Sequence, residues 1–238
     1  MDRSLAPPPD SEQMTITVKV PKELKSKTLE VMYRSSVCKR VTHGASGQRV
    51  ERDGYYGYDM QLERQVETDL YTARLPMDGG GACQWRLSNV MFGVVYADPS
   101  RFGEKVTWGT GGGVVVKFDH NRAPRSSGFP IEVDGNLTIR KDYYPWLYER
   151  FIGGYERYVS LVGEGGIYVV YQAMQARKVH FEPVLHRDYV VRSVGPKVKK
   201  DGNYTAITYP DGSFVADGRA GPDFLKLQSI RLSAEGKQ

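Results

Sequence analysis

Six Asp-Gly pairs recur along the 238-residue chain, and no other feature of the sequence limits its fold as much. Aspartate favours a turn by hydrogen bonding to nearby backbone, and glycine accepts the positive φ that tight turns require. The pairs begin at Asp53, Asp78, Asp134, Asp201, Asp211 and Asp217. Turn chemistry at this spacing is typical of an antiparallel sheet protein and disfavours a helical one.

Several segments between these turns alternate apolar and polar residues, which is the pattern of a strand with one buried face. Residues 14–20 (MTITVKV) show it most strictly. Further strands are predicted over residues 29–35, 58–67, 70–75, 85–96, 106–118, 135–140, 167–171 and 189–194. Pro210-Asp211-Gly212 lies between two β-prone runs and predicts a hairpin, because proline presets one turn dihedral and glycine accepts a positive φ.

Two glycine runs, residues 79–81 and 111–113, predict a bulge or a tight turn within the sheets. Neither run has the spacing of a dinucleotide-binding fingerprint or of a phosphate-binding loop, and no Lys-Ser or Lys-Thr follows at the required offset. We therefore expect these glycines to serve the backbone rather than a nucleotide.

These elements predict an all-β, or β-dominated α+β, fold in the form of an antiparallel β-sandwich. Residues 14–238 are expected to form one β-rich domain, or two packed β subdomains that divide near residues 120–135. One short helix is predicted around residues 143–152, where Pro145 suits a helix start and Gly153 a helix end.

Residues 1–13 (MDRSLAPPPDSEQ) are polar and rich in proline, and they predict a flexible tether of the kind left when a targeting segment is removed. The segment lacks the basic and apolar regions of a signal peptide. No window of the sequence approaches the roughly 20 apolar residues that a membrane-spanning helix needs.

The net charge of +5 comes from 33 basic and 28 acidic residues that are mixed along the chain, a balance that does not favour nucleic acid as a partner. The densest basic stretch is Lys197–Lys200, which is followed directly by an Asp-Gly pair. This stretch predicts a solvated loop, with a contact to phosphate or lipid headgroups as the alternative.

Cys38 and Cys83 lie in predicted strands without other cysteines or histidines at metal-ligand spacing. An even pair in such a chain predicts a disulfide, and hence a periplasmic or extracellular location. Two buried free thiols are the alternative.

The sequence offers no recognisable catalytic or metal-binding motif. The four histidines, His43, His120, His180 and His186, are scattered, and no Gly-x-Ser-x-Gly elbow occurs. We therefore predict that the chain is not an enzyme and uses no metal or cofactor. A hydrolase with a triad assembled from distant residues stays open as an alternative, because triad members are often far apart in a chain.

The chain has sixteen tyrosines, and two local clusters of them with nearby arginines indicate a surface that binds another molecule. Tyrosine, tryptophan and arginine are enriched where protein interfaces gain most of their binding energy. The alternative is that these aromatic residues pack inside the sheets. The predicted contact residues are Arg52, Tyr55, Tyr56, Tyr58, Tyr143, Tyr144, Trp146, Tyr148 and Arg150.

Three stretches carry a resemblance to a known family. They are Leu29-Glu30-Val31-Met32-Tyr33-Arg34-Ser35 with Cys38, Pro76-Met77-Asp78-Gly79-Gly80-Gly81, and Cys83-Gln84-Trp85-Arg86-Leu87-Ser88-Asn89-Val90-Met91-Phe92-Gly93-Val94. Over roughly residues 14 to 120, the chain resembles bacterial type VI secretion immunity proteins, which are small exported proteins or lipoproteins that antagonise phospholipase-class effectors.

This resemblance implies an immunity protein that binds and neutralises a cognate secreted lipase or phospholipase effector in the periplasm, without catalysis. It implies that Cys38 and Cys83 are the structural pair, and it allows for a lipid anchor in a full-length precursor. A carbohydrate-binding or envelope-binding β-sandwich module is the main competing hypothesis, since the same aromatic clusters would stack on sugar rings.

Overall fold

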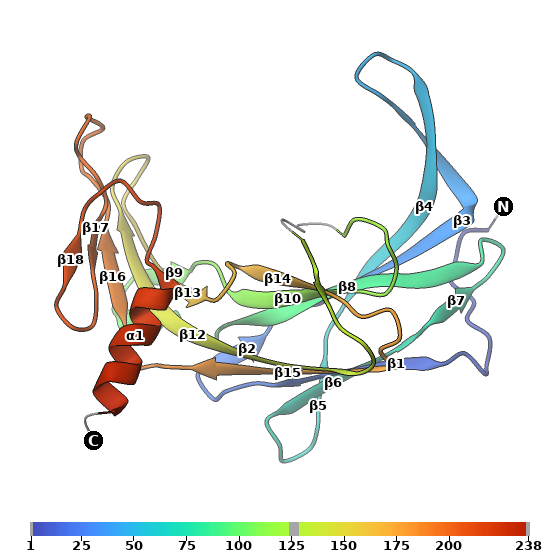
Figure 1. Cartoon of the computed structure of the whole chain (residues 1–238), viewed down its shortest axis with the longest axis horizontal. Helices are drawn as coiled ribbons and strands as arrows, with labels where there is room; N and C mark the ends of the chain where they lie inside the picture. Colours follow the sequence, from blue (N-terminus) through green and yellow to red (C-terminus); the bar gives the residue numbers. More distant parts are fainter. Residues whose placement is uncertain (1, 124–128, 237–238) are drawn as a thin grey trace.

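The structure is a computed structural model that describes residues 2–123 and 129–236. Within these residues, strands form two sheets that pack face to face, and a single α-helix lies on the outside (Figure 1). The β-dominated sandwich predicted from the sequence is confirmed.

Sheet A has eight strands, and its main path runs in the order β11, β14, β10, β8, β3, β4, with β2 and β7 also paired to β8. The bounds are β2 Leu24–Ser26, β3 Leu29–His43, β4 Arg49–Met60, β7 Asp78–Gly80, β8 Trp85–Tyr96, β10 Gly112–Lys117, β11 Ile131–Glu132 and β14 Tyr168–Gln172. The bounds of β8 coincide with those of the strand predicted over residues 85–96.

Sheet B has ten strands in the order β18, β17, β16, β12, β15, β1, β6, β5, with β13 paired to β12 and β9 paired to β13. The bounds are β1 Gln13–Lys19, β5 Glu63–Arg64, β6 Leu70–Pro76, β9 Val106–Trp108, β12 Leu137–Arg150, β13 Glu156–Gly163, β15 Lys178–Leu185, β16 Val191–Val194, β17 Ala206–Thr208 and β18 Phe214–Val215. A 3-10 helix, η1, spans Pro99–Phe102, and α1 spans Phe224–Glu235.

Both sheets contain parallel as well as antiparallel neighbours, so the expectation of a purely antiparallel sandwich is wrong. β1 and β15 run parallel, as do β10 and β14, and β12 is parallel to both β15 and β16. Turn signals in the sequence identify hairpins, but they do not reveal which distant strands meet after a crossover.

The main core lies between the two sheets, where the inward rows of the strands meet. Phe92 of β8 and Phe181 of β15 contact across it, with ring centroids 5.9 Å apart. The Tyr143 ring of β12 packs where Gly112 of β10 has no side chain, and a Cβ at Gly112 would overlap that ring. A close approach of this kind explains a glycine inside a buried strand.

A second core lies on the outer face of sheet B, where α1 covers it. It contains Tyr144, Val191, Ile207, Tyr209 and Leu227. The helix begins after Asp223, whose side chain accepts a hydrogen bond from the Lys226 backbone N–H as an N-cap. No helix in the described ranges is long and apolar enough to cross a membrane.

The helix predicted around residues 143–152 is wrong, because this segment is the second half of β12. Pro145 is tolerated there because β15 pairs with β12 up to Tyr143 and β16 begins at Trp146. The carbonyls of Tyr143 and Glu149 accept hydrogen bonds on that side of β12. Backbone groups of every second residue face the same side of a strand, so the nitrogen of Pro145 faces this side too. It carries no hydrogen to donate, and it lies at the gap between β15 and β16.

Four of the six Asp-Gly pairs are turns, with positive φ at Gly135, Gly202, Gly212 and Gly218. The predicted Pro210-Asp211-Gly212 hairpin is confirmed, since it joins β17 to β18. The pairs at Asp53 and Asp78 instead lie inside β4 and β7.

Part of the segment predicted to be a tether, residues 3–12, lies along β7 and β8. The Trp85 indole N–H donates to the carbonyl of Arg3 at 3.0 Å. The Ala6 N–H donates to the carbonyl of Gly79 at 2.9 Å. These contacts hold the described part of the segment against sheet A.

Cys38 and Cys83 form the predicted disulfide, with their Cα atoms 5.2 Å apart and 45 positions apart in sequence. The bridge joins β3 to the turn that precedes β8, and both sulfurs are in buried residues. A disulfide of this kind is typical of proteins that fold in an oxidising compartment, extracellular or periplasmic.

Replacing both cysteines, in Cys38→Ser/Cys83→Ser, should lower the free energy of unfolding by about 4 kcal/mol, because the bridge closes a long loop in the unfolded chain. Urea unfolding followed by tryptophan fluorescence measures the difference from oxidised wild type. Wild type treated with reductant should match the variant. Equal stability of the oxidised and cysteine-free proteins would contradict this account.

Candidate binding surface

The most prominent surface feature is a two-stranded arm, residues 36–53, formed by the far ends of β3 and β4. Pairing between β3 and β8 ends at Arg34, whereas pairing between β3 and β4 continues to His43 and Arg49. Figure 1 shows the arm curving away from the sandwich. Because the arm has no third strand or second layer, side chains on it such as Val37 and Val41 are about half exposed, at 50% and 47%.

The base of the arm is fixed by a buried polar contact beside the disulfide. The Ser35 hydroxyl accepts hydrogen bonds from the N–H groups of Val37 and Cys38 and donates to the carbonyl of Cys83 at 2.5 Å. The pairing register shifts just after Ser35, as in a β-bulge. On the neighbouring strand β4, Gly54 lies against the Cys38 carbonyl oxygen, and a Cβ at this position would overlap that oxygen. The arm therefore leaves the sheet at a defined point.

The arm also carries a long free edge of sheet A. β4 is the last strand of sheet A and has 12 residues. The strands at the other sheet ends, β11, β5 and β18, have two residues each. Natural proteins keep edge strands short because an open edge offers unpaired N–H and C=O groups to another chain. A long open edge is therefore a feature that a partner strand can use.

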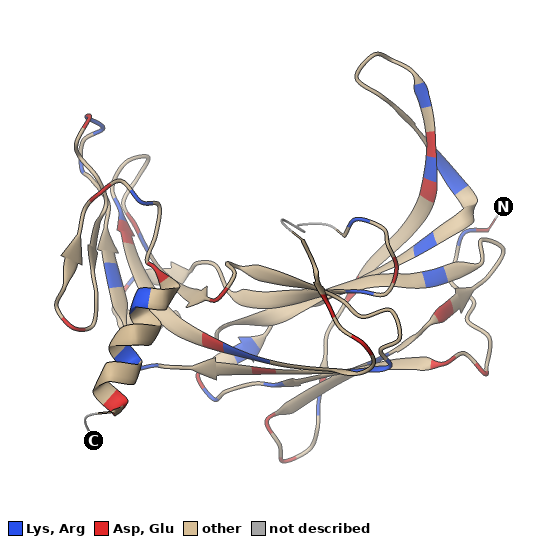
Figure 2. Cartoon of the chain, in the orientation of Figure 1, with Lys and Arg blue, Asp and Glu red and all other residues tan. Residues whose placement is uncertain are grey.

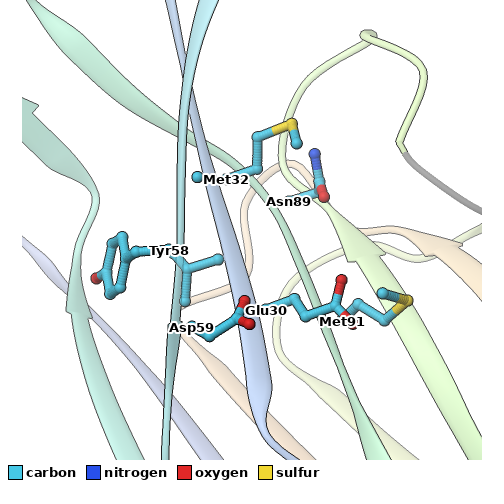
Figure 3. A pocket seen from close by; sticks show the side chains of 8 residues that line it. Glu30, Met32, Tyr58, Asp59, Asn89 and Met91 are labelled. Carbon is cyan, nitrogen blue, oxygen red and sulfur yellow. The ribbon is translucent and has the colours of Figure 1, made fainter.

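A cavity of about 330 Å³ opens on the outer face of sheet A, next to the arm. Alternation along the strands explains its lining, since every second residue of β3 and β4 points outward. Its outward-facing residues are Glu30, Met32, Gly57, Asp59, Asn89 and Met91. Figure 3 shows these side chains around the opening, with the ring of Tyr58 pointing away to the other side of β4.

The lining of this cavity combines acidic and apolar side chains. Glu30 and Asp59 are cross-strand neighbours and place two carboxylates on one side. Met32 and Met91 supply flexible apolar side chains, which adapt readily to a partner. No cluster of metal-ligating side chains occurs within the described residues.

Positive charge lies where the outer face of sheet A meets the arm. The Arg40 guanidinium lies 4.8 Å from the centre of the Tyr55 ring, and that of Arg34 lies 5.9 Å from it. Arg34 also donates to the Arg122 carbonyl at 3.2 Å. The Tyr55 side chain is 51% exposed despite these contacts. Tyr55 thus offers an aromatic ring that is already held in place.

The first predicted cluster is divided between the two sides of sheet A. Tyr55 and Arg52 are exposed. Tyr56 and Tyr58 are half-buried on the core side, where Tyr56 packs 5.9 Å from the ring of Trp85. Burial raises the pKa of Tyr58. Of this cluster, Tyr55 and Arg52 are the residues whose side chains a partner reaches directly.

The second predicted cluster requires a correction. Tyr143 and Tyr144 are fully buried, one in each core, so neither side chain is available to a partner. Trp146, Tyr148 and Arg150 are half-buried along the rest of β12. The structure does not bring the two clusters together, because β4 ends sheet A and β12 lies within sheet B.

Comparison with known proteins adds no relative from which a role can be transferred. No protein-family model, curated protein or solved structure matches the chain. The role of this surface must therefore be argued from its own geometry and from the sequence.

One histidine pairs with a carboxylate, far from the arm. His186 Nε2 lies 2.9 Å from Asp142 Oδ1, and the Tyr144 ring stacks on His186. Arg231 of α1 reaches Asp142 at 3.7 Å and donates to the Tyr144 hydroxyl at 3.0 Å. Within the described residues, no serine, threonine or cysteine side chain hydrogen bonds to His186. The arrangement holds α1 on sheet B rather than forming a nucleophile and base.

Lys141 is a buried charged residue that was not predicted from the sequence. Its side chain enters the main core from β12, and the residue is 4% exposed. Its Nζ lies 5.5 Å from the centre of the Tyr143 ring, and neither Nζ nor the Tyr143 hydroxyl has a hydrogen-bond partner in the described structure. Burial lowers the pKa of Lys141 to about 8. A buried amine of this kind costs stability while it is charged.

Lys141→Met should raise the free energy of unfolding at pH 7 by about 1–3 kcal/mol, because it removes a buried charge without leaving a cavity. In wild type, the folded protein loses the Lys141 proton near pH 8 and the unfolded chain near 10.5. The free energy of unfolding of wild type should therefore rise with pH between these two values, because only the unfolded chain still holds the proton there. Urea unfolding at pH 7 to 9.5 tests both points.

The exposed neighbour provides a matched control. Arg140→Met should leave the pH dependence of unfolding unchanged, since Arg140 lies on the solvent side of β12. A loss of stability in Lys141→Met at pH 7 would mean that the amine has a stabilising partner, contrary to the prediction.

Proposed function

We propose that this chain acts by binding another protein through the arm and the adjoining outer face of sheet A. The observation that supports this most is the arm itself, a projecting hairpin whose base is fixed by the disulfide and by Ser35. Beside it lie the exposed Tyr55 ring and the cavity lined by Met32 and Met91.

An arm fixed in this way suits tight binding because little conformational freedom is lost on association. Its open β4 edge pairs with an extended segment of the partner, and the backbone hydrogen bonds supply affinity. Tyr55, held by Arg40 and Arg34, acts as an aromatic anchor, while the adjoining cavity accepts a partner side chain. A standard interface of about 800 Å² per partner covers the arm and this face together.

We further propose that the partner is a type VI secretion effector of the lipase or phospholipase class, and that the chain is its periplasmic immunity protein. The class of partner is supported by the sequence resemblance around Cys38 and Cys83. The disulfide is in keeping with a periplasmic location. In this role the arm blocks the effector's active-site entrance, and the chain itself makes and breaks no bond.

Tyr55→Ala and Arg40→Ala should each weaken binding to the effector at least about tenfold, since both remove parts of the proposed anchor. The test uses a purified type VI secretion effector of the lipase class, titration calorimetry for binding, and hydrolysis of phospholipid vesicles for neutralisation. Tyr204→Ala is the matched control, because Tyr204 is also 51% exposed but lies between β16 and β17.

The outcomes separate the binding surface from the identity of the partner. Wild-type affinity in both Tyr55→Ala and Arg40→Ala would reject the arm and the adjoining face of sheet A as the contact surface. Failure of wild-type protein to bind or inhibit the effector, together with binding to a glycan array, would favour a carbohydrate-binding module instead.

A further inference from the structure

The turn between β12 and β13, residues 151–155, carries exposed apolar side chains. Ile152 is 42% and Tyr155 58% exposed, and between them Gly153 and Gly154 have positive φ. Phe151 packs against Tyr155 with ring centroids 5.2 Å apart. The turn therefore presents apolar groups outward without a strand or helix to cover them.

The loop that follows β16 lies beside this turn and supplies positive charge. The Gly195 N–H donates to the carbonyl of Glu149 at 2.8 Å, which joins the loop to the end of β12. Lys197 Nζ lies 5.4 Å from the centre of the Phe151 ring. The adjoining Val198 is 64% exposed. We call residues 151–155 and 197–200 together the wing tip.

The wing tip is positively charged, because it contains three lysines and no acidic residue. In the described part of the chain, no ion pair engages Lys197, Lys199 or Lys200. Arg150, by contrast, is paired with Glu156 at 2.7 Å. Figure 2 shows basic residues together with acidic colour at the end of this loop, where Asp201 follows Lys200. Figure 1 shows the loop at the opposite end of the molecule from the arm and projecting to the same side.

We propose that the wing tip binds the surface of an anionic phospholipid membrane. Ile152, Tyr155 and Val198 enter the headgroup region, and the three lysines contact lipid phosphates. The shape favours lipid over protein: the apolar groups lie on two projecting turns rather than in a groove, and a deformable bilayer fits a convex tip without a matching hollow. This site is independent of the proposed effector-binding surface.

Vesicle co-sedimentation tests the site with the full chain alone. Wild type should bind vesicles rich in phosphatidylglycerol and not pure phosphatidylcholine, and high salt should weaken the binding. Lys197→Glu/Lys199→Glu/Lys200→Glu should reduce binding by more than about tenfold, since each lysine near an anionic surface contributes about fivefold. Ile152→Asp/Val198→Asp should reduce it similarly, because it prevents insertion.

Two controls and a spectroscopic readout make the result decisive. Val66→Asp and Lys22→Glu change exposed residues elsewhere and should bind as wild type does. Tyr155→Trp should show a blue-shifted emission when vesicles are added. Circular dichroism confirms that each variant is folded. Wing-tip variants should still bind the effector, which separates this proposal from the previous one.

Three results would overturn the proposal. The first is no binding of wild type to phosphatidylglycerol vesicles at low salt. The second is unchanged binding in Ile152→Asp/Val198→Asp, which would reduce the interaction to charge attraction without insertion. The third is an equal loss of binding in the Val66→Asp control.

Discussion

The structure depends on one strand, β12, whose neighbouring tyrosines serve two different cores. Tyr143 points between the sheets and fills the space above Gly112, while Tyr144 points outward beneath α1 and against Val191. The two-residue repeat of a strand makes this unavoidable for adjacent residues. β12 also pairs with β13, β15 and β16, so both cores and most of sheet B are held in register by the same backbone.

Much of the sandwich could be predicted from the sequence, but the helix expected around Pro145 and the unexpected α1 are exceptions with clear physical causes. β8 was predictable because it is rich in apolar and aromatic residues and is followed by Asp98 and Pro99. The segment around Pro145 suggested a helix because a single chain does not reveal a gap between two partner strands. α1 did carry a signal: Asp223 as N-cap, followed by Phe224, Leu227 and Ile230 at helical spacing.

The binding surface was only partly predictable. Tyrosine and arginine content indicated an interface, but sequence could not separate exposed Tyr55 from buried Tyr143, because both lie in aromatic runs within strands. The arm was missed since residues 36–53 are polar on both faces and lack alternation, and Asp53-Gly54 indicated a turn where the strand continues. A strand that packs against nothing leaves no pattern of burial in its sequence.

The arm and the wing tip share one property: strands that continue past the layer that buries them. Such hairpins lose backbone entropy on folding and gain little burial in return, so an isolated pair is only marginally stable. Each is therefore held at its base, the arm by Cys38–Cys83 and Ser35, the wing tip by the Gly195 to Glu149 hydrogen bond. Among the described residues, the arm contributes only Cys38 to the main core, and the wing tip contributes no residue to either core. In the functions proposed above, these fixed and exposed surfaces contact other molecules.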